Sequence, residues 1–400
     1  TRTEMKSQRV LDADHDGPVV DEQPLGLYVH VPFCRTKCTY CDFTAFAGLG
    51  HRANDYLEAV DREAAFRASR TRRPVTTVFF GGGTPSELTL PQLRRCLDFV
   101  PRRFSVASNA SIELEANPET VDPERLAVMR EGGVSRLSIG VQSFHDAELR
   151  AIARFHGARG AVDSVRAARA AGFDSISLDL MLGIPGQTME TWRATLDQAL
   201  ALEPDHLSAY GLTLEPATPL AKQVRRGQVG LPDDDQQAAM YDAACDVLAR
   251  AGYRHYEVSN WAQPGCESAH NRRYWRALDY VGLGAGAAST LDGRRWTNHR
   301  TLERYIRSAL VTGTAEAEAE RLEARQAQME MVMLGLRTAE GVSNEGFQRH
   351  NGMSLRAWGG ERLTTLEASG LLEWHGEALV VPEERWFVLQ AIVAELASGA

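Results

Sequence analysis

Residues 27–43 read LYVHVPFCRTKCTYCDF, a short apolar run followed by three cysteines in one loop. Cys34, Cys38 and Cys41 have the spacing C-x3-C-x2-C. A [4Fe–4S] cluster normally takes four thiolates, so this loop is one ligand short of a complete set. The spacing therefore predicts an iron–sulfur cluster with one iron open to a further ligand.

Two other uses of closely spaced cysteines fit this loop less well. Closed zinc sites need four ligands, usually in two separate C-x2-C pairs, whereas the remaining cysteines, Cys96, Cys245 and Cys266, are scattered. Disulfides belong mainly to secreted proteins, and residues 1–25 lack the apolar core of a signal peptide. We therefore expect reduced thiols, a cytoplasmic location and a mobile lead-in at residues 1–25.

Composition sets broad limits on function. Of the 400 residues, 44% are hydrophobic and 24% are charged, as in an ordinary soluble protein with one large domain and a smaller one. The formal net charge of -9 gives no sign of the basic face that nucleic-acid binding requires, so we expect no nucleic-acid partner. No apolar run is long enough to span a bilayer. Composition leaves peripheral membrane contact and oligomeric state open.

Short apolar strands alternate with helix-forming stretches from residue 26 to residue 255. Such alternation is typical of βα units around a parallel sheet. Six units predict an α/β fold, a partial (β/α)6 barrel, with an open doubly wound sheet as the alternative. The strands are expected at residues 27–31, 77–80, 111–115, 136–141, 175–181 and 206–212. In either arrangement, the functional groups should lie at the C-terminal ends of these strands.

The remaining sequence predicts a connector at residues 256–312 and a small domain at residues 313–400. The run TAEAEAERLEARQAQMEMVMLGLR, residues 314–337, is strongly helix-forming. A helix near residues 363–370, a strand at 378–381 and a final helix follow. This pattern predicts a small α+β domain of the winged-helix type.

Polar or glycine-rich groups follow the predicted strands. They are Gly81-Gly82-Gly83-Thr84-Pro85, Glu115, Gln142, Arg154 and Asp179. Glycines let the backbone approach a ligand such as a small zwitterion, a carboxylate can accept hydrogen bonds from a ribose or an ammonium group, and an arginine can hold a carboxylate. Capping or solvation is the commoner role of any one of these residues. Their joint placement at strand ends favours a ligand pocket.

A second constellation is HNRRYW, residues 270–275. The imidazole of His270 is a possible ligand of haem iron. Tyr274 and Trp275 could stack on a flat macrocycle, and the neighbouring arginines could meet its propionates. From residue chemistry alone, a folded hinge with an aromatic anchor is the commoner explanation.

Together these motifs resemble the oxygen-independent coproporphyrinogen III oxidase-like branch of the radical S-adenosylmethionine (SAM) superfamily. The resemblance runs from Tyr28 to the C-terminus and is carried by YVHVPFCRTKCTYCDF, FFGGGTPS, LEANPE, SIGVQSF, ARFHG, DLMLGIPGQT, YEVSNWA, HNRRYW and GLGAGAAS. The dehydrogenase of this branch has a fourth cysteine two residues after the third, where this chain has Phe43. The HNRRYW segment instead resembles the HNxxYW signature of the haem chaperones of this branch.

The resemblance therefore implies a haem chaperone that delivers haem to apoproteins such as respiratory enzymes. The alternative is an oxidase that decarboxylates porphyrinogen propionates by means of a 5′-deoxyadenosyl radical. Both readings imply an electron donor for the cluster. The resemblance leaves open whether SAM is cleaved or only bound, and whether one or two SAM molecules bind.

The resemblance also implies roles for individual residues. Cys34, Cys38 and Cys41 would hold the [4Fe–4S] cluster. The SAM at the open iron would contact Tyr28, Gly83 and Glu115. A second SAM position of the dehydrogenase corresponds to Tyr40, Thr84, Pro85, Gln142, Arg154 and Asp179. Haem would be ligated by His270, with Asn271, Tyr274 and Trp275 shaping its site.

Overall fold

The computed structural model describes residues 23–397, so the predicted lead-in lies outside the described residues as far as residue 22. Six parallel strands form the centre of the molecule. They are β1 (Leu25–Val31), β4 (Val75–Gly82), β5 (Val106–Ala116), β6 (Arg136–Gln142), β7 (Ser175–Leu182) and β8 (His206–Gly211). Each expected strand is present, with bounds that differ by a few residues.

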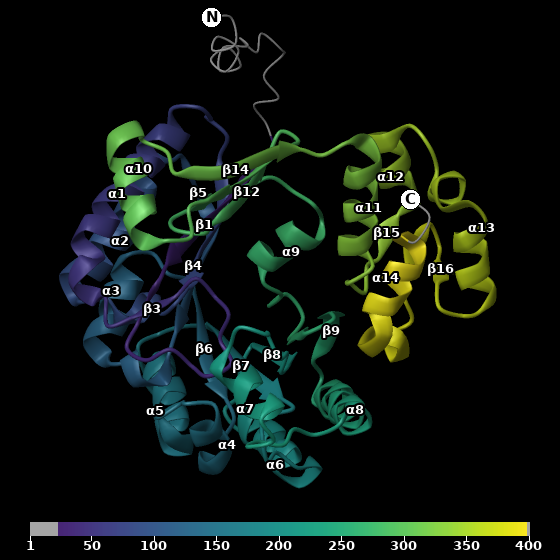
Figure 1. Cartoon of the computed structure of the whole chain (residues 1–400), viewed down its shortest axis with the longest axis horizontal. Coiled ribbons are helices and arrows are strands. Elements are labelled where there is room, and N and C mark those ends of the chain that lie inside the picture. The colour runs from purple at the N-terminus through teal and green to yellow at the C-terminus, as the bar shows by residue number, and fades with distance from the viewer. Residues whose placement is uncertain (1–22, 398–400) are drawn as a thin grey trace, which may run out of the picture.

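Helices separate these strands along the chain and lie on their outer side (Figure 1). They are α1 (Ala53–Ala68), α2 (Leu90–Arg103), α3 (Pro123–Glu131), α4 (Asp146–Ala151), α5 (Gly157–Ala170) and α6 (Met189–Leu200), followed by α7 (Pro219–Arg225) and α8 (Asp234–Arg250). The six strands stand side by side in sequence order. A doubly wound sheet would reverse its order at a switch point, so the fold is the predicted partial barrel.

Further strands extend both edges of the barrel to give a sheet of 12 strands. Beyond β8 lie β10 (Asn260–Ala262) and β9 (Arg254–Glu257), both antiparallel. Beyond β1 lie β11 (Tyr280–Leu283), which is parallel to β1, and the antiparallel strands β12 (Ala288–Leu291), β13 (Arg294–Asn298) and β14 (Glu316–Arg321). A small separate sheet pairs β2 (Phe33–Cys34) with β3 (Phe46–Ala47).

The core lies between the barrel strands and their helices. Every residue of β6 is buried, as expected for a strand covered on both faces. Helix α2 begins with a capping box between Thr89 and Gln92 and turns Leu93, Leu97 and Val100 towards the strands. Burial of each such side chain contributes about 2 kcal/mol. The helices therefore fix the strand ends that form the cavity described below.

Residues 256–312, predicted as a connector, supply strands and helices to the main body. Helix α9 (Ala269–Trp275) crosses beside β4 and β5, and α10 (Leu302–Thr312) packs on α1. The fully buried Glu63 of α1 joins these parts. Its carboxylate accepts hydrogen bonds from Tyr305 Oη at 2.7 Å and Asn298 Nδ2 at 2.9 Å. The described structure therefore ties this segment to the barrel through buried contacts.

One sequence expectation is wrong at residues 316–321, which were expected to be helical and form β14 instead. Gly313 adopts a left-handed conformation that ends α10. The following residues pair with β13 at the sheet edge, where Glu316 accepts a 2.7 Å hydrogen bond from Arg67 and also contacts Arg294. Pairing with a neighbouring strand thus outweighs the helix propensity of alanine and glutamate.

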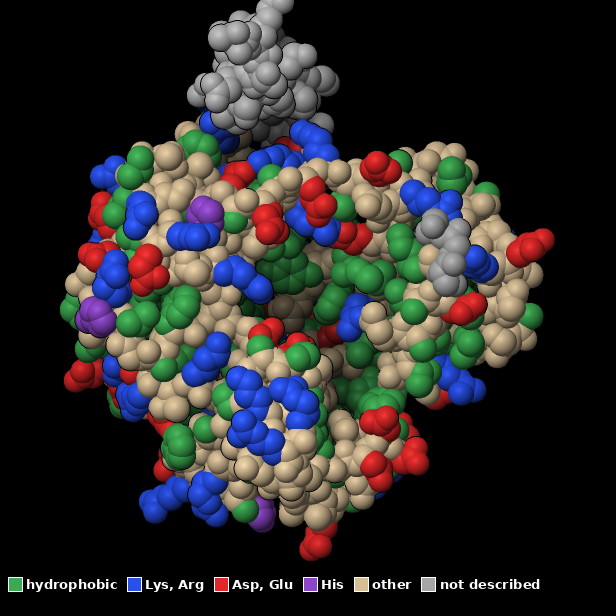
Figure 2. All heavy atoms as spheres, in the orientation of Figure 1, with side chains coloured by type: hydrophobic (Ala, Val, Ile, Leu, Met, Phe, Trp, Pro, Cys, Tyr) green, Lys and Arg blue, Asp and Glu red, His purple; other side chains and the backbone are tan. Residues whose placement is uncertain are grey.

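The C-terminal domain is the predicted small α+β unit. It contains α11 (Ala324–Gly335), β15 (Val342–Ser343), α12 (Asn344–Asn351), α13 (Leu355–Ala368), β16 (Glu373–His375), β17 (Ala378–Val380) and α14 (Leu389–Ala397). Short 3-10 helices occur at Gly50–Arg52, Pro85–Glu87, Pro118–Thr120 and Glu383–Val388. Figure 2 shows that the molecule is hollowed between this domain and the barrel, with hydrophobic side chains on the walls. Between residues 23 and 397, no helix combines the length and apolar character needed to cross a bilayer.

Candidate functional site

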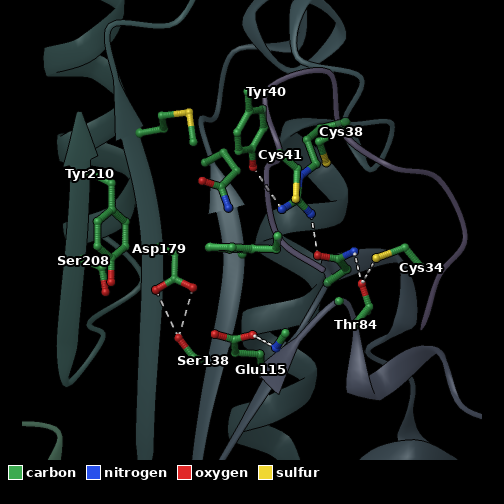
Figure 3. A pocket seen from close by; sticks show the side chains of 18 of the residues that line it. Cys34, Cys38, Tyr40, Cys41, Thr84, Glu115, Ser138, Asp179, Ser208 and Tyr210 are labelled. Atoms are coloured by element: carbon green, nitrogen blue, oxygen red, sulfur yellow. Dashed lines mark hydrogen bonds between the residues drawn. The ribbon is translucent and has the colours of Figure 1, made fainter. Parts of the chain in front are cut away.

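The C-terminal ends of the barrel strands surround a cavity of about 540 Å³, here called the barrel cavity (Figure 3). Most of the predicted site residues line it, as expected when strand ends meet at one edge of a barrel. They are Cys34, Cys38, Tyr40, Cys41, Gly83, Thr84, Glu115, Gln142, Arg154 and Asp179, together with Asn271 of α9. Tyr28 and Pro85 do not belong to its lining.

The cysteine loop closes one side of the barrel cavity. Cys34 lies on β2, and the backbone amide of Cys41 donates to the carbonyl of Cys38 at 3.3 Å, which turns the loop back on itself. All three thiols are free and partly exposed. Burial raises the pKa of the Cys34 thiol to about 11, so binding of iron to its thiolate would release a proton.

A chain of hydrogen bonds joins this loop to the neighbouring strands (Figure 3). Arg154 donates to Tyr40 Oη at 3.4 Å and also to Asn117 Oδ1. Asn117 Nδ2 donates to Thr84 Oγ1 at 3.2 Å, and Thr84 Oγ1 in turn contacts Cys34 Sγ at 3.6 Å. The arginine cation is therefore held beside a loop whose ligated form would carry negative thiolates.

Sequence reasoning missed Asn117 as a member of this chain. The signal was present in LEANPE, because residues two apart at a strand end point to the same side as Glu115. Gln142 was predicted, but its backbone was not. Its φ of 66° lies in the left-handed region, where a non-glycine residue is strained, as is common at binding sites.

The glycine loop packs directly on the strand that leads into the cysteine loop. A Cβ on Gly83 would lie 2.8 Å from the backbone carbon of Pro32, so no larger residue fits there. The amide of Gly82 donates to Glu115 Oε2 at 3.0 Å. Tyr28 lies outside the cavity, where its hydroxyl is 2.8 Å from His30 Nδ1. The loop therefore brings bare backbone and a carboxylate to the cavity wall.

Two carboxyl groups, Glu115 and Asp179, face the barrel cavity (Figure 3). Enclosure by protein raises the pKa of Glu115 to about 8, with a smaller contribution from the charge of Asp179. Enclosure likewise raises the pKa of Asp179 to about 6, although Ser138 donates to both of its oxygens at 3.1 Å. Such carboxyl groups favour a cationic ligand, because a nearby positive charge stabilises their ionised form.

His270 is buried on the inner side of the barrel, with 1% of its surface exposed. Its Nδ1 lies 3.0 Å from Thr77 Oγ1 and its Nε2 lies 2.8 Å from Tyr274 Oη. Burial, assisted by the charge of Arg273, lowers its pKa to about 3. The ring is therefore neutral, and both of its nitrogens already have partners.

The other residues of this segment divide between two cavities. Asn271 lines the barrel cavity, whereas Trp275 lines a second cavity of about 540 Å³ between α9, β9 and the C-terminal domain. We call the second one the junction cavity. Tyr274 lines neither, and its ring packs edge-on against Tyr280 with centroids 4.6 Å apart.

Comparison with known proteins identifies the family. The sequence pattern of the Radical SAM superfamily matches residues 28–199, and that of the HemN C-terminal domain matches residues 322–388. The "Heme chaperone HemW" of Bacillus subtilis is 36% identical over 347 residues, which cover 86% of this chain and 92% of that protein. This chain belongs to the HemW family.

A second HemW relative and a solved structure agree with this assignment. The Escherichia coli "Heme chaperone HemW" is 40% identical over 306 residues, covering 74% of this chain and 79% of that protein. Coproporphyrinogen III oxidase (HemN) from Escherichia coli, described as a radical SAM enzyme, superposes with a TM-score of 0.83 at 25% identity. The alignment covers 94% of this chain and 90% of that one.

Membership of the HemW family confirms the predicted fold class and superfamily. A radical SAM domain implies a [4Fe–4S] cluster and SAM as cofactors. The exposed Phe43, at the edge of the barrel cavity, stands where the dehydrogenase pattern has its additional cysteine. The domain boundaries and the cytoplasmic location stay predictions.

Proposed function

We propose that this protein is a haem chaperone, which binds haem and a SAM-ligated [4Fe–4S] cluster and delivers the haem to apoproteins such as respiratory enzymes. The observation that carries this proposal is the identity of 36–40% to proteins named heme chaperone HemW, over most of the chain. The HNRRYW segment and the absence of a cysteine at position 43 support it.

The residues of the barrel cavity fit the implied cofactors. Cys34, Cys38 and Cys41 supply three thiolates, the number that leaves one iron open. Gly83 offers bare backbone, and Glu115 offers a carboxylate that suits the cationic and hydroxyl groups of SAM. We assign the remaining SAM contacts, including any second molecule, to Tyr40, Thr84, Gln142, Arg154 and Asp179, which line the cavity. Tyr28 and Pro85 do not line it, and their contacts with SAM stay predictions from the resemblance.

When bound, the cluster would supply one-electron chemistry on SAM. The chain's own residues orient and enclose the cofactors. Arg154 fixes the cysteine loop through Tyr40 and Asn117, while Glu115 and Asp179 favour a cation beside it. The proposal needs SAM as a ligand and is compatible with either its cleavage or its retention.

The second candidate is an oxygen-independent coproporphyrinogen III oxidase. The TM-score of 0.83 to HemN favours it, and Phe43 disfavours it. Incubation of the reconstituted protein with coproporphyrinogen, SAM and a low-potential reductant distinguishes the two functions. Divinyl product formed over many turnovers would establish the oxidase and refute the chaperone.

The chaperone itself is tested by titrating anaerobically purified protein with hemin and following the Soret band. Transfer to an apo-haem protein is then measured after the excess hemin has been removed. We expect tight binding and transfer without porphyrinogen turnover. A protein that neither binds hemin nor transfers it would refute the proposal.

The predicted assignment of His270 as haem ligand is tested by His270→Ala in the same titration. In this conformation, ligation would require His270 to release Thr77 or Tyr274, each of which holds one ring nitrogen. Undiminished hemin binding by the variant would remove His270 from the site. A lost Soret shift in a variant that keeps its melting temperature would support the assignment.

A further inference from the structure

We propose that haem occupies the junction cavity, with the His350 imidazole as its iron ligand and Arg254, Arg272 and Arg276 around its propionates. This inference rests on the proposed haem-binding function and gives that function a site away from the His270 ring.

The junction cavity has the size and the walls that a macrocycle needs. Its volume of about 540 Å³ lies within the range of small-molecule pockets. Trp275 and Tyr256 come from the barrel side, and Met331 and Phe347 come from the C-terminal domain. Because the two walls belong to different domains, a flat ligand placed here would be enclosed on both faces. Figure 2 shows the hollow between these domains.

The cations of the junction cavity suit two carboxylates. Arg272 and Arg276 both contact Glu340, at 2.8 Å in the case of Arg276. Arg254 also lines the cavity, and within residues 23–397 no carboxylate pairs with it. Guanidinium groups bind carboxylates in a two-pronged geometry. Glu340 therefore occupies a position that a ligand propionate would compete for.

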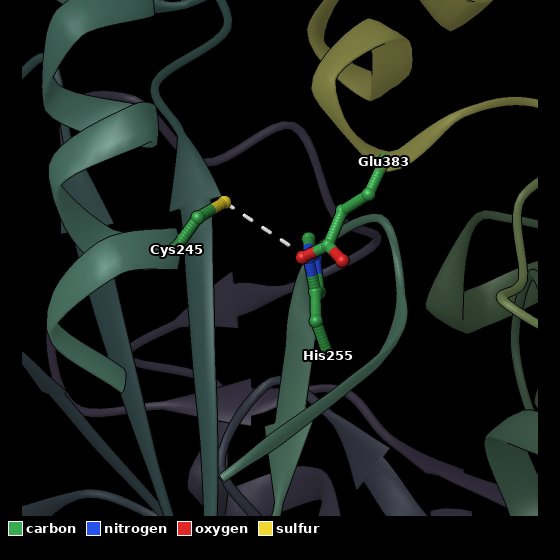
Figure 4. Close-up of side chains that lie close together, drawn as sticks. All are labelled: Cys245, His255 and Glu383. Carbon is green, nitrogen blue, oxygen red and sulfur yellow. Dashed lines mark hydrogen bonds and ion pairs between the residues drawn. The ribbon is translucent and has the colours of Figure 1, made fainter. Parts of the chain in front are cut away.

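His255 lines the cavity but is already committed (Figure 4). Its ring stacks on Trp261 with centroids 4.0 Å apart. Nδ1 lies 2.7 Å from Glu383 Oε1 and 3.9 Å from Cys245 Sγ. Nε2 lies 3.3 Å from the carbonyl oxygen of Val258. These contacts hold the ring in place and leave neither nitrogen free for iron.

His350 of α12 is the second histidine of the lining and is exposed. Among the described residues its ring has no hydrogen bond and no ion pair, so a nitrogen is free to ligate iron. His270 has no such freedom, since both of its nitrogens have partners. The junction cavity therefore combines aromatic walls, the cation of Arg254, which is unpaired within the described chain, two arginines paired with Glu340, and an available imidazole.

The first test compares hemin with metal-free protoporphyrin on the full-length, cluster-loaded protein. We expect His350→Ala to weaken hemin binding about tenfold, or 1.4 kcal/mol, and to change its Soret maximum. Protoporphyrin binding should be unchanged, because it lacks the iron that His350 would ligate. The matched control is His375→Ala, an exposed histidine of β16 outside the cavity lining, which should behave as the parent.

The second test replaces charged residues of the junction cavity, and one of the replacements should increase the affinity for hemin. Arg272→Gln with Arg276→Gln should weaken both hemin and protoporphyrin about tenfold. Glu340→Gln should strengthen both about threefold, because it removes the competing carboxylate. A merely structural salt bridge would lower the melting temperature in Glu340→Gln and give no gain in affinity. Arg349→Gln, at an exposed neighbour paired with Glu345 at 2.6 Å, is the control.

The outcomes separate this inference from the function on which it rests. A parent protein that binds no hemin refutes both. If the parent binds hemin, and His350→Ala and the double arginine variant bind it equally tightly, the junction site is refuted. The chaperone function is not affected by that result. Should His350→Ala fail to fold, the gain expected for Glu340→Gln decides the matter, since unchanged affinity there also overturns the site.

Discussion

The barrel cavity and the junction cavity have similar volumes, about 540 Å³ each, but their polar groups are held in different ways. In the barrel cavity the side chains fix one another, as in the chain from Arg154 through Asn117 and Thr84 to Cys34. In the junction cavity Arg272 and Arg276 pair with Glu340, but Arg254 and His350 are exposed and, within the described part of the chain, have no ion-pair partner.

This difference matches two different tasks. Groups fixed before binding lose little freedom when a ligand arrives, so they suit a cofactor that is held tightly in one orientation. Water and salt weaken the interactions of exposed charged side chains, and these side chains lose more conformational freedom when they bind a ligand. Such groups suit a cargo that must be released, and the two walls of the junction cavity come from different domains.

The largest expected effect tests whether the two cavities are independent. Cys38→Ser should abolish the cluster, because two thiolates do not hold a [4Fe–4S] centre in place of three. Hemin affinity measured without SAM should stay within twofold of the parent, since Cys38 lines only the barrel cavity. Iron content, visible absorption and hemin titration check this.

Cys245→Ser, at a cysteine outside the loop, serves as the control for loss of a thiol and should retain the cluster. If Cys38→Ser instead loses hemin in proportion to iron, the haem lies at the cluster and the contrast between the cavities fails.

The next largest effect is the pH dependence of SAM affinity in the barrel cavity. Below a pKa of about 8, Glu115 is protonated in the ligand-free protein, and a cationic SAM favours its ionised form. Binding therefore releases a proton, and SAM affinity should rise with pH by up to about tenfold per unit until pH 8 and then level off. Calorimetry between pH 6.5 and 9 measures this slope.

Glu115→Gln should flatten the pH profile and weaken SAM about tenfold, as expected for loss of a hydrogen bond to a charged group. The control is Glu119→Gln, at an exposed residue of the same segment. A profile that stays steep in Glu115→Gln would assign the proton to another group, such as Asp179.

The two cavities also differ in how far the sequence predicts them. The barrel cavity is built from motifs that each follow a local strand, so C-x3-C-x2-C, Gly81–Gly83 and Glu115 could be placed at one edge from periodicity and strand order. The hydrogen-bond chain of this cavity was harder to predict, because the role of Asn117 depends on the direction in which its side chain points. The φ of Gln142 has no local signature either.

The junction cavity could not be predicted because its walls come from residues far apart in the chain, such as Arg254, Trp275 and Phe347. Pairing of distant segments also explains the error at residues 316–321, where contact with β13 decides the conformation. The HNRRYW motif predicted a haem ligand, but it carried no signal that His270 is buried. In its buried position both ring nitrogens of His270 have partners within the protein.

Salt concentration should have a smaller effect, and it should act mainly on hemin affinity at the junction cavity. Arg254 and Arg276 are exposed, so raising the salt from 50 to 500 mM should weaken their attraction for propionates and reduce hemin affinity about threefold. SAM affinity should change less, because Glu115 and Asp179 are enclosed by protein. Parallel titrations at both salt concentrations make the comparison, and equal losses for the two ligands would contradict it.

The smallest effect concerns helix α9, which contributes Asn271 to the barrel cavity and Trp275 to the junction cavity. A ligand in the barrel cavity that contacts Asn271 would move α9, and α9 also carries Trp275 in the wall of the junction cavity. SAM should therefore change hemin affinity by about fivefold. Asn271→Ala should reduce this factor to below twofold. The Ser268 cap of α9 would stay intact, because it accepts from the Asn271 backbone amide at 3.2 Å.

The hemin affinity of Asn271→Ala without SAM should equal that of the parent, since its side chain does not line the junction cavity. Thermodynamic reciprocity adds an internal check, because hemin must change SAM affinity by the same factor in each protein. If SAM leaves hemin affinity unaltered in the parent, α9 only separates the two cavities. Release of haem would then need a signal other than the state of the barrel.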